Sequence, residues 1–112
     1  MKKSLLFICS SNIDRSKAAE ELFKKSKMFN AESAGTHDDS IKHVNQIMIN
    51  EADIIFVMSE GTNHHLTYLK NNFNIRNKKI HDLHVRDIYF KDDIRLKHLL
   101  RKRISKIIKG SL

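Results

Sequence analysis

The sequence predicts an α/β fold: a single three-layer domain, residues 1–112, in which a four-stranded parallel sheet is flanked by helices on both faces. Three observations predict it. Short apolar runs of strand length alternate with segments whose apolar residues recur at helical spacing, as in parallel sheets with crossover helices. Residues 4–8 and 53–58 are apolar almost throughout, which is typical of strands buried on both faces. A chain of 112 residues is long enough for one domain.

The first half of the chain supplies three strands and two helices. Residues 4–8 are the first strand, and residues 17–28 follow with apolar side chains at helical spacing. Residues 31–34 are a short second strand that ends at a glycine. A second helical pattern occupies residues 41–50, and residues 53–58 (DIIFVM) are the clearest buried strand. This order predicts strand, helix, strand, helix, strand.

The second half adds two helices and one strand. Ser59 is a candidate N-cap for a third helix, whose inward face carries Leu66, Leu69 and Phe73. Residues 79–83 are a weaker fourth strand. The last helix carries apolar residues at intervals of four, namely Leu96, Leu100, Ile104 and Ile108. Since ligands of open parallel sheets bind at the carboxyl ends of the strands, the first place to expect a site is the end of residues 4–8.

Positive charge is concentrated at the C-terminal end of the chain. The formal net charge is +8, and residues 94–112 carry no acidic residue. The basic residues of this segment are Arg95, Lys97, Arg101, Lys102, Arg103, Lys106 and Lys109. Such a stripe is either the solvated face of an amphipathic helix or a contact for a polyanion such as nucleic acid.

Several classes of protein are disfavoured by composition. No apolar run approaches the roughly 20 residues of a membrane span, so no membrane partner is expected. The single cysteine excludes an intramolecular disulfide, which favours a reducing, cytoplasmic setting. The spacing of Cys and His does not suggest a metal site, and no cofactor is expected. His64 and His65 are adjacent and are expected at the surface or half-buried, without a metal role.

The chain's only cysteine begins the stretch CSSNIDRS, which runs from Cys9 to Ser16 between a strand and a helix N-terminus. Unpaired backbone N–H groups and the helix dipole make such a loop an anion site. The planar fork of Arg15 can hold two phosphate oxygens, and a thiol in this field is expected to be largely ionised. Asn12 tolerates a left-handed backbone, and Ser16 is placed to donate a hydrogen bond to the thiolate. The alternative is that Cys9 is a small buried apolar residue.

The stretch LLFICSSNIDRSKAAEELF resembles the phosphate-loop signature of the low-molecular-weight protein tyrosine phosphatases. The matching residues are Cys9, Asn12, Ile13, Arg15, Ser16, Ala19 and Glu20. Residues 33–36 (SAGT) and 52–60 (ADIIFVMSE) resemble the second and third strands of that family. The chain is most similar to the short, compact bacterial members, and the family's four-stranded parallel sheet agrees with the pattern above.

The resemblance implies a phosphomonoester hydrolase. Cys9 would attack phosphorus and form a phosphocysteine, while Asp87, in the segment DIYF, would be the general acid and Tyr89 would lie near the mouth of the site. The rival acids are Asp82, Asp92 and Asp93, of which the last two are also candidate helix caps. The residues expected to bind phosphate are Ser10, Ser11, Asn12, Ile13, Asp14, Arg15 and Ser16. The implied substrate is a phosphotyrosine protein or a small aryl phosphate.

Three departures from the family pattern affect these expectations. Asp14 stands where the family commonly has a second cysteine, which removes redox protection of Cys9 and places a carboxylate beside the anion site. The DIYF segment lacks the family's proline and is therefore expected to be less rigid. The chain is shorter between Gly35 and Asp53, where the family carries an aromatic wall, so a shallower and more open cleft is expected.

Two other functions remain open from the sequence. The first is a non-catalytic module that binds phosphate or a polyanion such as RNA, with the basic C-terminal helix as the contact. The second is an arsenate reductase, but that chemistry on this fold needs further thiols, so an external thiol donor would be required. Strong salt dependence would favour polyanion contact.

Overall fold

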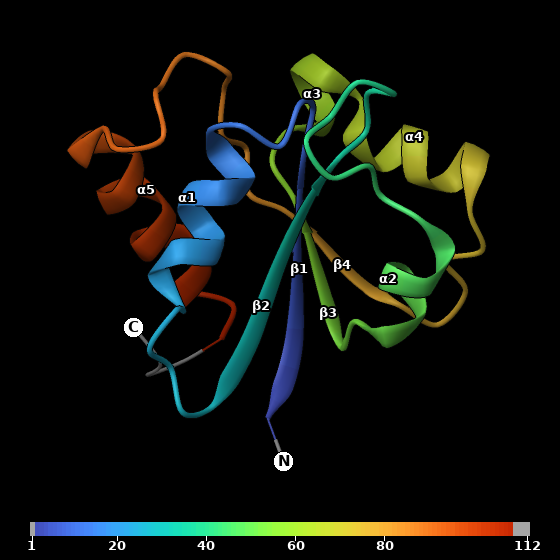
Figure 1. The fold of residues 1–112 in the computed structure, drawn as a ribbon, viewed down its shortest axis with the longest axis horizontal. Coiled ribbons are helices and arrows are strands. Elements are labelled where there is room, and N and C mark those ends of the chain that lie inside the picture. Colours follow the sequence, from blue (N-terminus) through green and yellow to red (C-terminus); the bar gives the residue numbers. More distant parts are fainter. Residues whose placement is uncertain (1, 109–112) are drawn as a thin grey trace.

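Four strands form one parallel sheet in residues 2–108, the part of the chain that the computed structural model describes (Figure 1). Lys109, counted above among the basic residues of the C-terminal segment, lies outside these residues. The sheet order is β2-β1-β3-β4, and every neighbouring pair is parallel. The strands are β1 (Lys3–Cys9), β2 (Phe29–Gly35), β3 (Ile54–Val57) and β4 (Lys79–Asp82). The predicted parallel sheet is confirmed.

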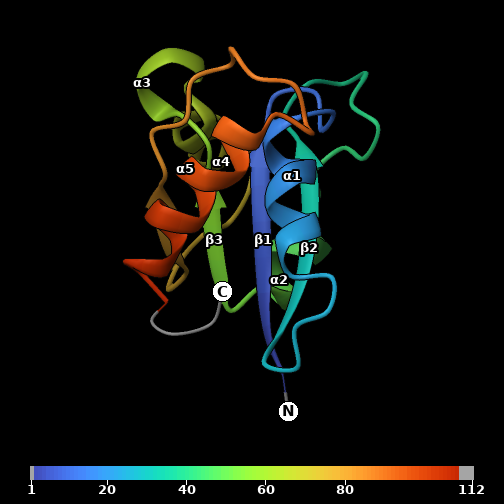
Figure 2. The ribbon, with the colours of Figure 1, turned by 90° about the vertical axis from the view of Figure 1, so that its left-hand side faces the viewer.

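Helices cover both faces of this sheet. In Figures 1 and 2, α1 and α5 lie together on one face, and α2 and α4 lie on the other. The helices are α1 (Arg15–Leu22), α2 (Gln46–Glu51), α3 (Glu60–Asn63), α4 (His65–Asn72) and α5 (Ile94–Ser105). Within residues 2–108, none of these helices has the length and apolar character that a bilayer crossing requires.

The central strand β1 distributes its side chains between two apolar cores. Leu5, Phe7 and Cys9 belong to the core beneath α1 and α5, whereas Leu6 and Ile8 belong to the core beneath α2 and α4. This division follows from the alternation of side chains along a strand. Cys9 is therefore the last residue of the central strand, on the face that α1 covers.

Two of the predicted helices are shorter than the apolar spacing indicated. α1 ends at Leu22 and not near residue 28, and α2 begins at Gln46 and not at residue 41. Asn45 caps α2, because its side chain accepts a hydrogen bond from the N–H of Met48 at 2.9 Å. Before it, residues 41 and 42 form a bend, and His43 forms a parallel bridge with Gly35. Tertiary pairing thus takes residues 41–45 out of the predicted helix.

The predicted third helix is divided in two at His64. Ser59 caps α3 as expected, since its hydroxyl accepts from the N–H of Thr62 at 3.1 Å. His64 then has a left-handed backbone with φ of 54°, and α4 begins at His65. The expectation that His65 lies at or near the surface is wrong, because its side chain is buried with no exposed fraction. The break at His64 turns the next residue toward the interior.

Candidate active site

A small cavity lies at the carboxyl end of β1. Its volume is about 90 Å³, far below the roughly 300–1,000 Å³ of pockets that enclose drug-sized ligands. It can therefore hold a small group while the rest of a ligand stays outside. The residues that line it are Cys9, Ser10, Ser11, Ile13, Asp14, Arg15 and Asp87. The structure thus brings together the predicted nucleophile, the predicted arginine and the predicted acid.

Residues 10–14 form the loop between β1 and α1, and backbone N–H groups of residues 36–41 bind carbonyl groups at its start. Cys9 O accepts from the N–H of Thr36, and Ser10 O accepts from the N–H of His37, both at 3.0 Å. Ser11 O accepts from the N–H of Ile41 at 3.3 Å. Among the described residues, none of the amide groups of residues 10–14 has an acceptor. With the carbonyls engaged elsewhere, these N–H groups are left to bind an anion.

Asn12 and Ser16 form a hydrogen-bond chain that ends at the cysteine. Asn12 has the expected left-handed backbone, with φ of 59°, and is buried. Its Nδ2 donates to Ser16 Oγ at 2.8 Å, and Ser16 Oγ lies 2.9 Å from Cys9 Sγ. Because the amide supplies a hydrogen to Ser16, the hydroxyl hydrogen of Ser16 is available for the sulfur. This arrangement directs a hydrogen-bond donor at the sulfur of Cys9.

Arg15 lies at the start of α1 with its side chain only 2% exposed. Its Nη1 donates to Asn63 Oδ1 at 2.9 Å and to Val85 O at 2.8 Å, which fixes one edge of the guanidinium. Burial lowers the pKa of Arg15 from its ordinary value, and the nearby carboxylate of Asp87 opposes that shift. The fixed edge points the remaining donors of the guanidinium toward the cavity that Arg15 lines.

The side chain of Ser10 is held by a hydrogen bond with His65, the first residue of α4. His65 Nδ1 accepts from the N–H of Ser59 at 3.0 Å, so the ring proton lies on Nε2, which donates to Ser10 Oγ at 3.0 Å. Arg15 Nη2 contacts the same oxygen at 3.4 Å. Burial, followed by the charge of Arg15, lowers the pKa of His65 to about 3, which keeps the ring neutral. Since Ser10 Oγ accepts from both groups, its own hydrogen is free to be donated into the cavity.

Asp87 is the one of the four candidate acids that lines the cavity, beside Asp14 of the loop. Its Oδ1 lies 3.7 Å from Arg15 Nε, and its side chain is 58% exposed. The rival Asp82 accepts from the N–H groups of Glu60 and His84, at 3.1 and 2.8 Å, and so has a structural role. Asp93 caps α5 through the N–H of Arg95 at 2.8 Å. Asp87 therefore has the geometry that an acid at this site needs.

The remaining rival acid, Asp92, is 76% exposed and lies 3.9 Å from the amines of Lys91 and Lys97. Tyr89 is not among the residues that line the cavity. It packs against the core beneath α1 and α5, with the guanidinium of Arg95 5.5 Å from its ring centre. The apolar residue at the cavity is Ile13, which is 53% exposed. The cavity thus has no aromatic wall among the described residues, as expected for an open cleft.

Sequence reasoning missed the groups that support the site from other segments. Asn63, His65 and the carbonyl of Val85 all contact Ser10 or Arg15 across 48 or more positions of the chain. Their local signals were weak, because His65 stands in a polar stretch and Asn63 ends a short helix. The one available signal is position, since Ser59 comes shortly after β3, which pairs with β1, and Leu83 follows β4, which pairs with β3.

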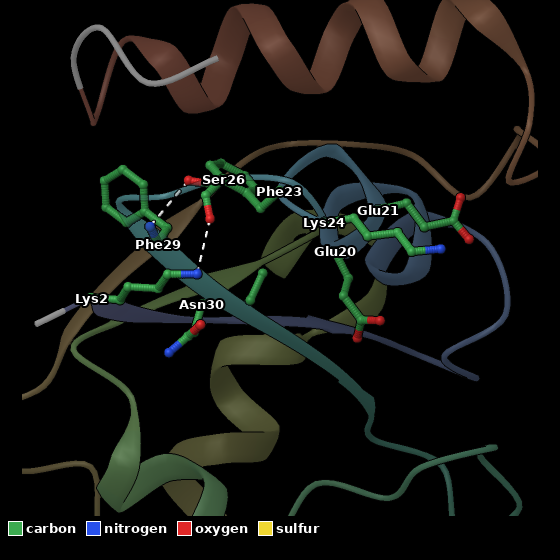
Figure 3. Close-up of a pocket in the computed structure, with 9 residues that line it drawn as sticks. Lys2, Glu20, Glu21, Phe23, Lys24, Ser26, Phe29 and Asn30 are labelled. Carbon is green, nitrogen blue, oxygen red and sulfur yellow. Dashed lines mark hydrogen bonds between the residues drawn. The ribbon is translucent and has the colours of Figure 1, made fainter.

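Other hollows lie away from this chemistry. Figure 3 shows a larger one, about 370 Å³, between α1 and the amino ends of β1 and β2. Lys2 donates there to the carbonyl of Ser26 at 3.0 Å, and the charged side chains of Lys2, Glu21 and Lys24 are exposed. This hollow is at the opposite end of β1 from Cys9. Within residues 2–108, no three His, Cys, Asp or Glu side chains are placed to hold a metal ion.

Comparison with known proteins adds evidence at the level of fold. No family model and no curated protein matches the sequence of this chain. Among solved structures, the tyrosine phosphatase Wzb from Escherichia coli K30 has a TM-score of 0.74 at 19% identity, covering 98% of this chain and all of Wzb. SP-PTP, the low molecular weight protein tyrosine phosphatase of Streptococcus pyogenes, has a TM-score of 0.71 at 20% identity, over 95% of this chain and 91% of its own.

A third similar structure has a different chemistry. The thioredoxin-dependent arsenate reductase Cg_ArsC1' of Corynebacterium glutamicum has a TM-score of 0.58 at 17% identity, over 96% of this chain and 59% of its own. At these identities, likeness establishes the fold, and the chemistry must be argued from the site. The chain has the fold of the low-molecular-weight protein tyrosine phosphatases.

Proposed function

We propose that the protein is a phosphomonoester hydrolase with Cys9 as its nucleophile. The observation that carries the proposal is one cavity lined by Cys9, Arg15, Asp87 and the loop of residues 10–14, whose amide groups have no acceptor within residues 2–108. A thiolate, a buried guanidinium and backbone donors around one small site suit a tetrahedral dianion, and a carboxylate beside them suits proton transfer. The fold shared with tyrosine phosphatases supports this function.

The reaction has two steps. Cys9 Sγ attacks phosphorus, an S–P bond forms, and the P–O bond to the leaving group breaks as Asp87 gives its proton to the leaving oxygen. The carboxylate of Asp87 then takes a proton from a water that attacks phosphorus, which releases phosphate and returns the thiolate. Arg15 and the amide groups of residues 10–14 stabilise the charge on the equatorial oxygens in both steps.

The proposed substrate is an aryl phosphate, either phosphotyrosine in a protein or a small molecule. A cavity of about 90 Å³ encloses the phosphoryl group and leaves the organic part outside. Ile13 is exposed at the rim and offers an apolar surface to an aromatic ring. The lone thiol has no partner for a disulfide within the chain, so we place the protein in a reducing, cytoplasmic compartment.

The two alternatives have less support. An arsenate reductase would need a thiol from outside, because Cys9 is the only cysteine of the chain. The polyanion module relies on the basic residues of α5, several of which have internal contacts. Arg95 pairs with Asp93 at 2.7 Å, and Arg103 donates to the carbonyls of Leu83 and His84. The exposed basic residues without a recorded ion pair on the described part of α5 are Arg101 and Lys102.

The test is hydrolysis of para-nitrophenyl phosphate between pH 5 and 7. We expect activity in the wild type and none in Cys9→Ser. With phenyl phosphate, whose leaving group needs a proton, we expect a kcat reduced by about 10²-fold or more in Asp87→Asn, which is the usual contribution of a general acid. Asp92→Asn is the matched control, because it removes the same charge from an exposed residue of the same segment. An equal loss in both aspartate variants would contradict the role of Asp87.

A further outcome separates the alternatives. A folded wild type that binds phosphate without hydrolysing it would contradict the proposed enzyme and favour the binding module. In that case, RNA binding would fall steeply with salt and would weaken in an Arg101→Ala, Lys102→Ala double variant. Phosphatase activity that is insensitive to these two substitutions would show that the basic face is not part of the catalytic site.

A further inference from the structure

Asp87 lies in the segment of residues 85–91, and the apolar side chains on either side of Asp87 are mostly exposed. Asp87 has a side chain that is 58% exposed, and its neighbours Ile88 and Phe90 are 60% and 82% exposed. The segment also has no proline. Val85, at the start of the segment, is buried in the core, and Tyr89 packs against the same core, whereas Asp87 lies between these two anchored residues. The position of the carboxylate therefore depends on polar contacts elsewhere in the segment.

Two such contacts flank Asp87, and both lead to the loop between β1 and α1. On one side, Val85 O accepts from Arg15 Nη1 at 2.8 Å. On the other, the backbone N–H of Lys91 donates to Asp14 Oδ1 at 2.8 Å. Asp14 and Arg15 are consecutive residues, so the segment is attached at both ends to one point beside Cys9. In Figures 1 and 2, the segment between β4 and α5 arches over the end of the sheet where this loop lies.

The contact at Lys91 has a second component. Lys91 Nζ lies 2.8 Å from Glu21 Oε2, on the same helix that Asp14 precedes. This pair is solvent-accessible and therefore contributes little to holding the segment. The bond to Asp14 is the less dispensable of the two, because it holds the main chain of the segment itself, whereas the pair with Glu21 acts through the long, flexible side chain of Lys91.

We infer that Asp14 is a positioning residue: its carboxylate holds the 85–91 segment against the β1–α1 loop and so places Asp87 beside the reacting phosphoryl group. The inference rests on the proposed function. It assigns a role to the position at which the related family commonly has a second cysteine. It also explains how an acid-bearing segment without proline keeps its geometry.

The experiment compares two substrates that differ in leaving group. Para-nitrophenolate leaves readily without protonation, whereas phenolate needs the proton of the general acid. Asp14→Ala is expected to lower kcat/KM for phenyl phosphate at least about tenfold more than for para-nitrophenyl phosphate, because a general acid supplies about 10²–10⁴-fold. Asp14→Asn keeps an acceptor oxygen for the N–H of Lys91. Its ratio of kcat/KM for the two substrates is therefore expected to stay close to that of the wild type.

Two controls make the result specific. Asp92→Ala removes the same charge from an exposed position and is expected to leave the ratio of the two substrates unchanged. In an Asp87→Asn background, Asp14→Ala is expected to have no further selective effect, since the group that it positions is gone. Equal losses on both substrates, or no loss, would overturn the inference.

Amide hydrogen exchange gives a readout that does not need activity. Exchange in residues 85–91 is expected to be faster in Asp14→Ala than in the wild type and in Asp14→Asn. Unchanged exchange in Asp14→Ala would overturn the inference. A wild type that is inactive would refute the proposed function. It would also overturn the inference that Asp14 positions a catalytic acid, and an exchange difference would then show only that Asp14 holds the segment.

Discussion

Acidification is expected to destabilise the protein through His65. The buried ring has no exposed surface and accepts a hydrogen bond at Nδ1, so the folded state disfavours its protonated form. Its pKa is lowered to about 3 in the folded protein, against about 6.5 in an unfolded chain. As the pH falls below about 6.5, the unfolded state takes up a proton that the folded state does not, and the free energy of unfolding decreases.

The magnitude follows from the two pKa values. Between pH 7 and pH 5, the unfolded state gains about 2 kcal/mol from protonation at this one residue, while the folded state gains almost nothing. For a urea m-value near 2 kcal/mol/M, that is a shift of about 1 M in the unfolding midpoint. The chain has seven histidines, so the contribution of His65 must be separated from the others.

The assay is urea unfolding of the wild type and of His65→Asn at pH 7 and pH 5. Asn places an acceptor oxygen where Nδ1 accepts from Ser59, but it does not titrate. We expect His65→Asn to be less stable at pH 7, and its stability to change by about 2 kcal/mol less than that of the wild type between the two pH values. A difference below about 0.5 kcal/mol would refute the reasoning, because His65 would then titrate alike in both states.

Two further predictions concern the loop between β1 and α1. Ser10→Ala removes the hydroxyl hydrogen that is free to be donated into the cavity, so kcat/KM for an aryl phosphate is expected to fall about 10–100-fold. Ser10→Thr keeps the hydroxyl group and is expected to keep most of the activity. Equal activity in the wild type and both variants would contradict this role. Gly35→Ala would place a Cβ 2.5 Å from Ser10 O and against Ser40 Oγ, and it is expected to lower the free energy of unfolding by about 1–3 kcal/mol together with kcat/KM. Gly61→Ala is the control, since its Cβ has no neighbour within 4 Å; a Gly35→Ala protein as stable as this control would contradict the close approach.

Local sequence determined the features that depend on short-range chemistry. The two apolar runs became β1 and β3, and the single cysteine lies where a buried strand meets a helix N-terminus. The backbone of Asn12 and the contact of Ser16 with Cys9 also follow from residues within one loop. These features were predictable because strand burial, helix N-termini and left-handed turns each have a local signature.

The supporting groups were not predictable for a physical reason. The role of His65 depends on one left-handed residue, His64, and His, unlike Gly or Asn, is not a residue from which a left-handed turn is predicted. The late start of α2 depends on a bridge between Gly35 and His43, which is a tertiary pairing. The sequence showed only that Asp14 places a carboxylate beside the anion site. Its hydrogen bond with the N–H of Lys91 was not predictable, because it joins residues 77 positions apart.

The β1–α1 loop shows why these distant contacts matter for chemistry. Residues 36–41 bind its carbonyls, His65 binds Ser10, and the 85–91 segment is joined to Asp14 and Arg15. Each contact uses a carbonyl or a side chain and none uses an amide hydrogen of the loop, so together they leave the ring of N–H groups for an anion. The anion site is thus a property of three segments from separate parts of the chain. Substitutions in any of the three should change the response of the reaction to leaving group, pH or phosphate affinity without altering a reacting atom.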